Sequence, residues 1–349
     1  MRCYPVTAFG APLVRSERPT PTPTGTEVLL RITASGVCHS DLHLLEGKFD
    51  LGEGEHLDLA RSMKLPLTLG HEIAGEVVAL GPEAHGVRLG DRRVAFPWIG
   101  CGSCAICARG EEQLCARPRA LGVSTDGGYA DHVVVPHPRY LLDFAGLPDT
   151  VACTLCCSGL TAFGALRKVV PLEASAPLLV IGVGGVGLAA VRLAKRVTGV
   201  APLAADVDPA KRAAALAAGA AAAIDPAEPG AAKSLIKETG GGVAAALDFV
   251  GAAASAQFGL DALRKGGRLV IVGLFGGSIR LKLPLVPMRA ISIGGSYVGS
   301  LAELAELVRL AQAGGLPPMP VHPRPLDTVN AALEDLRAGR IVGRAVLQP

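Results

Sequence analysis

The chain has 349 residues, half of them hydrophobic, and a formal net charge of only +3. This length and apolar content predict a large core and two domains, or one fold with an insertion. Because there is no basic tract and the longest apolar run is interrupted by four glycines, we expect neither nucleic acid nor a membrane as partner. The N-terminus lacks the apolar core of a signal peptide, so a cytoplasmic protein is expected.

Short strands are predicted to lead into a polar motif. Residues 1–35 are expected to hold strands, the last of them over 27–33, and C-H-S-D-L-H follows at 38–43. Its thiol could bind zinc, the hydroxyl of Ser40 could touch what the zinc polarises, and the imidazole of His43 could accept a proton. Taken alone, the same six residues could equally form a polar loop after a strand.

A second motif, G-H-E-I-A-G at 70–75, follows a segment rich in glycine and charge. That segment, 47–66, is expected to be a surface loop. His71 lies just before the strand expected over 76–80, where the backbone can fix its side chain. With Glu72 adjacent and a cysteine upstream, we interpret His71 as a zinc ligand.

Four of the nine cysteines crowd into 101–115 with the spacing C-x2-C-x2-C-x7-C. Four thiols this close cannot all pair as disulfides without strain, but they can surround one tetrahedral ion. Four sulfur ligands would leave no position open for substrate. The spacing therefore predicts a structural zinc that braces a lobe of about 100–117, with the ligands Cys101, Cys104, Cys107 and Cys115. The alternative is a zinc ribbon that binds nucleic acid, for which the lobe offers only Arg109, Arg117 and Arg119.

Three further cysteines follow a strand expected over 129–135. Cys153, Cys156 and Cys157 open a segment that we expect to be helical through Val169. The positive end of a helix dipole favours a thiolate near the N-terminus. Spacing alone does not decide which of the three binds metal, and the others would be small buried hydrophobes.

From position 178 onward, strands and helices alternate. Helices are expected over 186–198 and 210–218, and strands over 178–183, at a segment ending at Asp206, and over 221–224, 243–249, 268–273 and 290–295. This alternation predicts an α/β fold with a doubly wound parallel sheet of six strands. Pro202 cannot donate a ladder hydrogen bond, so we place it at the very start of the second strand.

The first of these strands is followed by the glycine-rich turn G-x-G-G-x-G at 182–187. The turn opens a helix, and Asp206 lies 19 residues after its last glycine. Such glycines allow the backbone to approach a pyrophosphate at the helix N-terminus. Asp206 can accept hydrogen bonds from the adenosine ribose and would repel a 2′-phosphate, so NAD is favoured over NADP.

Together these motifs resemble the zinc-dependent alcohol dehydrogenases of the medium-chain dehydrogenase/reductase superfamily, over essentially the whole chain. The pattern G-H-E-x2-G-x5-G matches 70–81, the structural-zinc cysteines match those at 101–115, and C-x-G-[IL]-T matches 157–161. The last match selects Cys157 over Cys156 as a zinc ligand.

The resemblance implies roles for individual residues. Cys38, His71 and Cys157 would hold a catalytic zinc, with water or substrate as fourth ligand. Glu72 would lie behind that zinc and sometimes coordinate it, and Asp41 would orient the zinc histidine. The proton relay would consist of Ser40 and His43. The cofactor would be contacted by His39, Gly182, Gly184, Gly185, Val186, Gly187, Asp206, Lys211, Gly273, Leu274, Tyr297 and Arg344, with His39 and Arg344 at its phosphates and Gly273, Leu274 and Tyr297 at the nicotinamide.

The resemblance also implies how the chain is divided. A mostly β, GroES-like catalytic domain would take 1–158 and return over 314–349, and an NAD-binding Rossmann domain would take 159–313. The active site would lie in the cleft between them, with pocket walls from Phe49, Trp98 and Tyr297. Homodimers or homotetramers would form through the edge strand at 290–295.

The leading functional prediction is an enzyme that transfers a hydride between a primary or secondary alcohol and NAD, giving an aldehyde or ketone, with two zinc ions per chain. A zinc-free reductase of the same fold, acting on activated C=C bonds, is disfavoured by the ligands at 38, 71 and 157. A binding protein without turnover is disfavoured by Ser40 and His43, which binding alone does not require.

Overall fold

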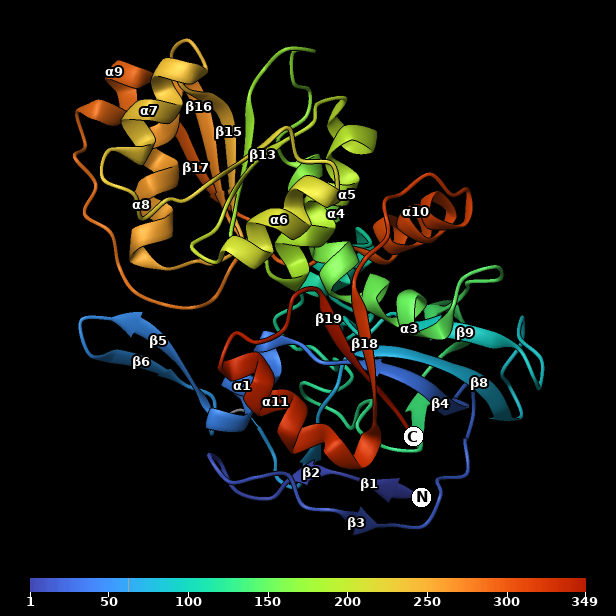
Figure 1. Ribbon diagram of the computed structural model, residues 1–349. Helices are drawn as coiled ribbons and strands as arrows, with labels where there is room; N and C mark the ends of the chain where they lie inside the picture. Colours follow the sequence, from blue (N-terminus) through green and yellow to red (C-terminus); the bar gives the residue numbers. More distant parts are fainter. Residues whose placement is uncertain (62) are drawn as a thin grey trace.

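Two sheets of different kinds organise the computed structural model, which describes residues 1–61 and 63–349. One is a six-stranded parallel sheet, seen with its helices in the upper half of Figure 1; the other, below it, is a seven-stranded sheet of mostly antiparallel pairs. The last strands of the chain lie in the lower half, in the same sheet as strands from its N-terminal part.

The parallel sheet has the strand order β14-β13-β12-β15-β16-β17. Its strands are β12 (Leu178–Ile181), β13 (Leu203–Ala205), β14 (Ala222–Ile224), β15 (Val243–Asp248), β16 (Leu263–Ile271) and β17 (Ser292–Gly295). The helices after residue 157 that precede or connect them are α4 (Ser158–Arg167), α5 (Gly185–Thr198), α6 (Pro209–Ala217), α7 (Ala231–Glu238), α8 (Ala253–Ala262) and α9 (Leu285–Arg289). β12 and β15 are buried along their whole length, as expected for strands covered by helices on both faces. The predicted doubly wound parallel sheet is confirmed.

Local differences from the predicted boundaries have simple causes. β13 begins at Leu203, so Pro202 lies just outside the ladder, where its missing N–H costs nothing. β16 begins at Leu263, five residues earlier than expected from its apolar run, because Val243 pairs with Leu263 before a register shift. Asp208 caps α6 as its position suggests, accepting a hydrogen bond from the Ala210 N–H at 2.8 Å.

The mixed sheet has the order β11-β9-β8-β4-β19-β18, and β10 also pairs with β4. Its strands are β4 (Val28–Gly36), β8 (Glu72–Leu80), β9 (Arg92–Ala95), β10 (His132–Val135), β11 (Leu141–Asp143), β18 (Val321–Pro325) and β19 (Arg344–Gln348). β19 is antiparallel to β4, with Val346 opposite Gly36. The end of the chain therefore completes the sheet that the N-terminal strands begin.

The segment predicted as a plain surface loop, 47–66, instead contains a hairpin of β5 (Lys48–Gly52) and β6 (Glu55–Asp58). Phe49 pairs with Leu57, and the turn is made by Glu53 and Gly54, both with positive φ. The loop prediction was wrong because Gly54 lies in a tight turn and charged residues of this segment lie on the exposed strands of a hairpin. Residue 62 of the same segment lies outside the described residues.

The remaining elements are short. They are β1 (Arg2–Cys3), β2 (Pro5–Val6), β3 (Ser16–Glu17), β7 (Leu67–Thr68), α1 (His39–Glu46), α2 (Ala105–Ala108), α3 (Asp149–Ala152), α10 (Leu301–Gln312), α11 (Val329–Arg337) and the 3-10 turns η1 (Glu112–Leu114), η2 (Pro138–Tyr140), η3 (Cys153–Cys156) and η4 (Leu326–Thr328). Within the described part of the chain, no single helix is long and apolar enough to cross a membrane. One bent pair of helical segments, 149–156 and 158–167, is long and apolar enough when the two are taken together.

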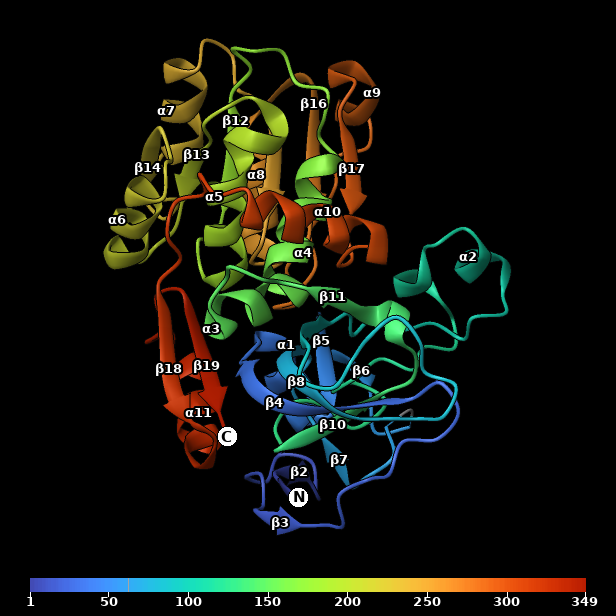
Figure 2. The same ribbon diagram turned by 90° about the vertical axis from the view of Figure 1, so that its right-hand side faces the viewer.

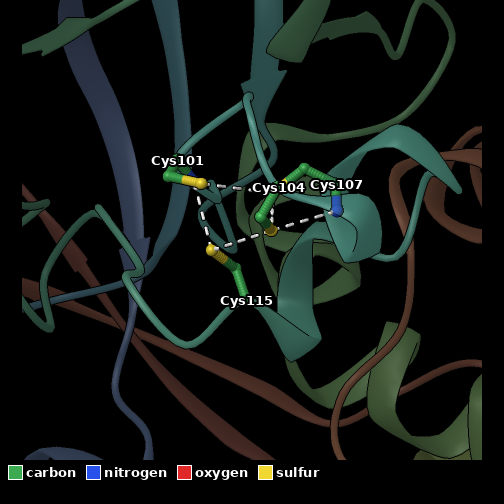
Figure 3. A group of neighbouring side chains, drawn as sticks. All are labelled: Cys101, Cys104, Cys107 and Cys115. Carbon is green, nitrogen blue, oxygen red and sulfur yellow. Dashed lines mark hydrogen bonds between the residues drawn. The ribbon is translucent and has the colours of Figure 1, made fainter.

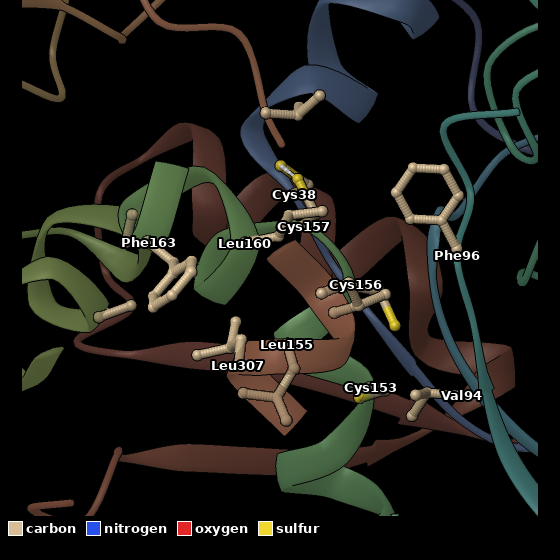
Figure 4. Packing of buried hydrophobic residues seen from close by; sticks show 14 of the residues in the cluster. Cys38, Val94, Phe96, Cys153, Leu155, Cys156, Cys157, Leu160, Phe163 and Leu307 are labelled. Atoms are coloured by element: carbon tan, nitrogen blue, oxygen red, sulfur yellow. Dashed lines mark hydrogen bonds between the residues drawn. The ribbon is translucent and has the colours of Figure 1, made fainter. Parts of the chain in front are cut away.

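A continuous apolar core joins the two sheets through α4 and the turn before it (Figure 4). The helix predicted from Cys153 is interrupted: α3 ends at Ala152, η3 follows, and α4 begins only at Ser158. Cys153 and Cys156 are fully buried in this core, as expected for small hydrophobes. Cys157 becomes the N-cap of α4, so the break in the helix brings its thiol to the edge of the core.

Candidate active site

The first ligand candidate is fixed by the start of α1. Cys38 follows β4 directly and is the N-cap of α1. Its N–H donates a hydrogen bond to Asp41 Oδ2 at 2.8 Å, so the third residue of the helix closes the turn. Ser40 lies beside it, with its Oγ 3.8 Å from Cys38 Sγ.

Asp41 also holds His71. Both side chains are fully buried, and Asp41 Oδ1 lies 3.3 Å from His71 Nδ1. The hydroxyl of Tyr129, likewise buried, donates to Asp41 Oδ2 at 2.6 Å. Burial lowers the pKa of His71, but the charges and hydrogen-bonding contributions of Asp41 and Cys38 together raise it well above its ordinary value. Sequence analysis missed Tyr129, which is 88 residues from Asp41 and carries no motif.

The three predicted catalytic ligands meet at one point. Ligand atoms of Cys38, His71 and Cys157 all lie within 4.8 Å of one another, and all three residues are buried. The two sulfurs are 3.9 Å apart. Tetrahedral zinc with Zn–S bonds of about 2.3 Å places two thiolates about 3.8 Å apart, so the spacing fits. The hydrogen bond from the Cys157 thiol lowers the pKa of the Cys38 thiol well below its ordinary value, which favours a thiolate there.

Glu72 does not join these ligands in this structure. Its Oε1 accepts a hydrogen bond from the Ser158 N–H at 2.9 Å and lies 2.6 Å from Arg344 Nη2. Its Oε2 is buried against Gly36 and has no hydrogen-bond partner in the described structure. Glu72 therefore lies behind the ligand group, with its Oε1 held by Arg344 and Ser158, and its occasional coordination of the metal stays a prediction.

The four clustered cysteines form a separate group in a lobe that stands out from the body around α2 (Figures 2 and 3). All four sulfurs lie within 4.8 Å of one another, and three of their separations are 3.4–4.0 Å, far beyond disulfide bonding and close to the edge of a zinc tetrahedron. Backbone N–H groups of Cys101, Cys107 and Arg117 point at these sulfurs. A hydrogen bond from the Ser103 backbone lowers the pKa of Cys101 to about 5. The donor set fits a closed structural zinc.

The lobe's arginines serve the lobe itself. Arg109 pairs with Glu111 at 2.9 Å, Arg119 donates to the Gly100 carbonyl at 3.4 Å, and Arg117 Nη2 lies 3.9 Å from Cys101 Sγ. They therefore give the zinc-ribbon alternative no dedicated basic surface.

Aromatic rings surround the predicted relay. The His43 ring lies 4.7 Å from that of Phe49 and 5.4 Å from that of His39, and His39 lies 5.3 Å from Phe275 of the segment after β16. Burial lowers the pKa of both histidines, which favours neutral imidazoles. A neutral, half-buried His43 is suited to accept a proton.

Two of the predicted pocket walls lie beside the ligand group. The Trp98 ring is 5.3 Å from His71 and 5.9 Å from Tyr297, and its Nε1 donates to the Cys156 carbonyl at 3.1 Å. Tyr297 is 49% exposed, so its ring is open to contact from outside the chain. Phe49 packs on His43 rather than on these two rings.

The glycine-rich turn is built around two close approaches. Gly182 has a φ of +77°, and a Cβ at Gly187 would overlap the Gly182 carbonyl, so helix α5 can pack on β12 only with glycine there. Gly184, the N-cap of α5, has nothing within 4 Å of where a Cβ would be. This open space in front of a helix N-terminus fits a pyrophosphate. Gly185 and the half-buried Val186 begin the helix.

Asp206 follows β13 and is bound to that turn. Its Oδ2 accepts the Val183 N–H at 2.8 Å, and its Oδ1 accepts the Asp208 N–H at 2.9 Å. Lys211 Nζ is 3.8 Å from Asp208 Oδ2, one turn into α6. The carboxylate therefore stands at the end of the strand where an adenosine ribose is expected, with Lys211 beside it.

The other predicted cofactor residues divide into two groups. Gly273 packs against Gly251, and Leu274 after it is 46% exposed. Arg344, expected at a cofactor phosphate, is instead buried: a Cβ at Gly185 would lie 2.5 Å from Arg344 Cδ, and the guanidinium is turned to Glu72. It lies beneath the glycine-rich turn, because its strand β19 belongs to the other sheet.

A further residue, Asp248, was missed by sequence analysis. It ends β15, is fully buried, and accepts hydrogen bonds from the N–H groups of Val250 and Gly251 and from the hydroxyl of Ser255. These bonds fix the turn beside Gly273. An acid at the end of an otherwise apolar strand was the available signal.

Comparison with known proteins agrees with this geometry. Residues 24–146 match the family described as "Alcohol dehydrogenase GroES-like domain", and residues 185–313 match "Zinc-binding dehydrogenase". The chain is 38% identical to an NAD-dependent alcohol dehydrogenase of Sulfurisphaera tokodaii and 39% identical to one of Saccharolobus solfataricus, each over 100% of both chains. The crystal structure of the alcohol dehydrogenase from Aeropyrum pernix, 32% identical, superposes with a TM-score of 0.90 and full coverage of both chains.

The chain therefore belongs to the zinc-dependent alcohol dehydrogenases of the medium-chain dehydrogenase/reductase superfamily, and the family and fold class predicted from its motifs are confirmed. Its predicted activity and cofactors, hydride transfer between an alcohol and NAD with two zinc ions, agree with this membership and with the two cysteine-containing ligand groups.

Proposed function

We propose that this enzyme oxidises primary or secondary alcohols, or reduces the corresponding aldehydes and ketones, at the group formed by Cys38, His71 and Cys157. The observation that carries the proposal is the convergence of these three buried ligands from distant parts of the chain; among the described residues, the group contains no fourth protein ligand. Zinc bound there would act as a Lewis acid that lowers the pKa of the alcohol hydroxyl.

The chain's own residues would then move the proton. Ser40 and His43 are three positions apart on α1, so they lie on the same face of the helix. We propose that the Ser40 hydroxyl bonds to the substrate oxygen and that His43 delivers the proton to solvent. The lowered pKa of His43 supports this role, because the imidazole is neutral and able to accept a proton over a wider pH range.

For NAD we propose the cradle of Gly182, Gly184 and Gly187, with Asp206 and Lys211 at the adenosine ribose. The open space at Gly184 supports a pyrophosphate there. Gly273, Leu274 and Tyr297 would line the nicotinamide side, and His39 would lie toward the pyrophosphate. We further propose that Arg344 acts from beneath the turn, through its contact with Gly185. Trp98 and Tyr297 would shape the substrate pocket.

The division of the chain remains our proposal: 1–158 and 314–349 form the catalytic domain, and 159–313 the cofactor domain. It is supported by the membership of β18 and β19 in the sheet of β4. We also propose that the enzyme works in the cytoplasm, since all nine cysteines are free thiols.

We propose a homodimer or homotetramer formed through the edge strand β17. Ile293 on this strand is 37% exposed, and Leu283 and Met288 nearby are 71% and 70% exposed. These apolar side chains would be covered by a second copy. Light scattering after size exclusion tests this: Met288→Lys with Ile293→Lys should shift the mass toward the monomer.

The function is tested by following NADH formation at 340 nm, an ordinary assay wavelength, over primary, secondary and aromatic alcohols while zinc is quantified. Active enzyme should contain two zinc ions per chain, in agreement with the two ligand groups. One zinc ion or none in freshly purified active enzyme would contradict the assignment. Failure of every alcohol with both ions and NAD bound would refute the substrate class.

A further inference from the structure

Three helices that begin at the active site end together at another cavity. α4 is capped by Cys157, α5 by Gly184, and α10 by Ser300, three residues after Tyr297. Figures 1 and 2 show α4 and α5 lying side by side, with α10 next to α4. Their opposite ends border a cavity of about 510 Å³. This volume lies within the range of pockets that hold small organic ligands.

The cavity has an apolar floor and a charged rim. It is lined by Phe163, Arg167, Val170, Arg196, Val197, Glu306, Arg309 and Leu310. Phe163 is only 2% exposed and belongs to the core cluster shown in Figure 4, on the same helix as Leu160 and just beyond Cys157. The apolar surface open to a ligand is therefore that of the half-buried Val170, Val197 and Leu310.

The charges at the rim do not balance. Arg167 pairs with Glu306 at 2.7 Å and lies over the Phe163 ring at 5.6 Å. The side chains of Arg196 and Arg309 make no hydrogen bond or ion pair among the described residues. Two of the three guanidiniums facing the cavity are thus without an acidic partner.

Helix-dipole compensation offers a simpler explanation for each arginine taken singly. All three lie in the last turn of their helices, where a cation is favourable. That effect acts on each helix separately, however, and does not require three last-turn arginines to converge on one cavity with a buried aromatic floor. Their convergence is the observation that indicates a ligand.

We propose that this cavity binds a phosphate monoester that carries an aromatic or aliphatic body. Arg196 and Arg309 would hold the dianion, since guanidinium groups bind phosphate oxygens in paired hydrogen bonds. The body would lie on Val170, Val197 and Leu310. α5 has 14 residues, so its C-terminal end lies about 20 Å from the glycine-rich turn, and a cofactor phosphate at that turn would not reach this site.

The test is isothermal titration of the zinc-loaded, full-length enzyme with phenyl phosphate at low ionic strength, with saturating NADH occupying the cofactor site. One phenyl phosphate should bind per chain. The double variant Arg196→Gln with Arg309→Gln should bind it at least about a hundredfold more weakly, since each of the two arginines loses at least one hydrogen bond to a charged group and each such loss accounts for roughly a tenfold change. Arg88→Gln is the matched control, because Arg88 is exposed and lies in the loop between β8 and β9.

Two further titrations test the assigned chemistry. Inorganic phosphate should bind at least about tenfold more weakly than phenyl phosphate because it lacks the apolar body. Benzoate should also bind at least about tenfold more weakly than phenyl phosphate, because it carries one negative charge rather than a dianion. Thermal melting and alcohol oxidation of the double variant should match those of the parent, since neither arginine touches the active site. Equal affinity of parent and double variant, absence of phenyl phosphate binding at millimolar concentration, or benzoate binding as tightly would overturn the proposal.

Discussion

Replacing Tyr129 with Phe would remove one hydroxyl beside the catalytic ligands and leave the ring in place. That hydroxyl donates to Asp41 Oδ2 at 2.6 Å, and both side chains are fully buried. Burial and the charge of Asp41 raise the pKa of Tyr129 well above its ordinary value, so it remains a donor at every working pH. A hydrogen bond to a charged group contributes about 1.5–3 kcal/mol. We expect the free energy of unfolding to fall by about 2 kcal/mol.

The same substitution should weaken zinc binding. Asp41 is the residue that holds His71 Nδ1, at 3.3 Å, and the Cys38 N–H, at 2.8 Å. With one anchor of the carboxylate removed, His71 is less firmly oriented, and loss of such a supporting residue typically costs 10–100-fold in metal affinity, about the range expected here. Competition with a chromogenic chelator measures this affinity, and denaturant unfolding measures stability. The zinc of the four-cysteine lobe should be unaffected.

Tyr4→Phe provides the matched control. Tyr4 is 4% exposed, and its hydroxyl has no hydrogen-bond partner in the described structure, although its backbone N–H bonds to the Tyr129 carbonyl. Removing an unpartnered buried hydroxyl should be nearly neutral or slightly stabilising. Equal losses in the two variants, or unchanged zinc affinity in Tyr129→Phe, would refute the role assigned to the Asp41 contact.

Three further predictions concern the relay, the cofactor and the zinc ions. Because burial lowers the pKa of His43, kcat of the parent enzyme should persist as pH falls to the ordinary histidine range and decline below it. His43→Ala should lower kcat about 10²-fold at neutral pH, and its kcat should recover partly as pH rises. A constant ratio of the variant's kcat to the parent's between about pH 6 and pH 9 would exclude a relay role. Asp206→Gly with Val207→Arg should shift kcat/KM toward NADP, whereas an unmodified enzyme that already prefers NADP would show that Asp206 was misinterpreted. Cys104→Ser should lower Tm with loss of one zinc, while Cys38→Ser should abolish turnover and leave Tm nearly unchanged. The reverse pattern would show that the structural and catalytic roles were assigned to the wrong sites.

Much of the cofactor half could be predicted from the sequence because its signals are local. A buried strand, a glycine-rich turn and a helix follow one another within 178–198, and each is specified by residues a few positions apart. The four-cysteine lobe is local in the same sense, since its ligands all lie within 101–115. Motif spacing was also sufficient to indicate the family and to select Cys157.

Tertiary structure decided what depends on contacts between distant segments. Tyr129 meets Asp41 across 88 residues, and Arg344 turns to Glu72 because β19 returns to the sheet of β4, neither of which any local pattern encodes. The break between α3 and α4 likewise follows from packing around a buried core rather than from helix propensity. Short-range spacing specifies turns, caps and ligand clusters. The partner of a buried polar group is set instead by which strands and helices pack together, so these partners could not be predicted from the sequence alone.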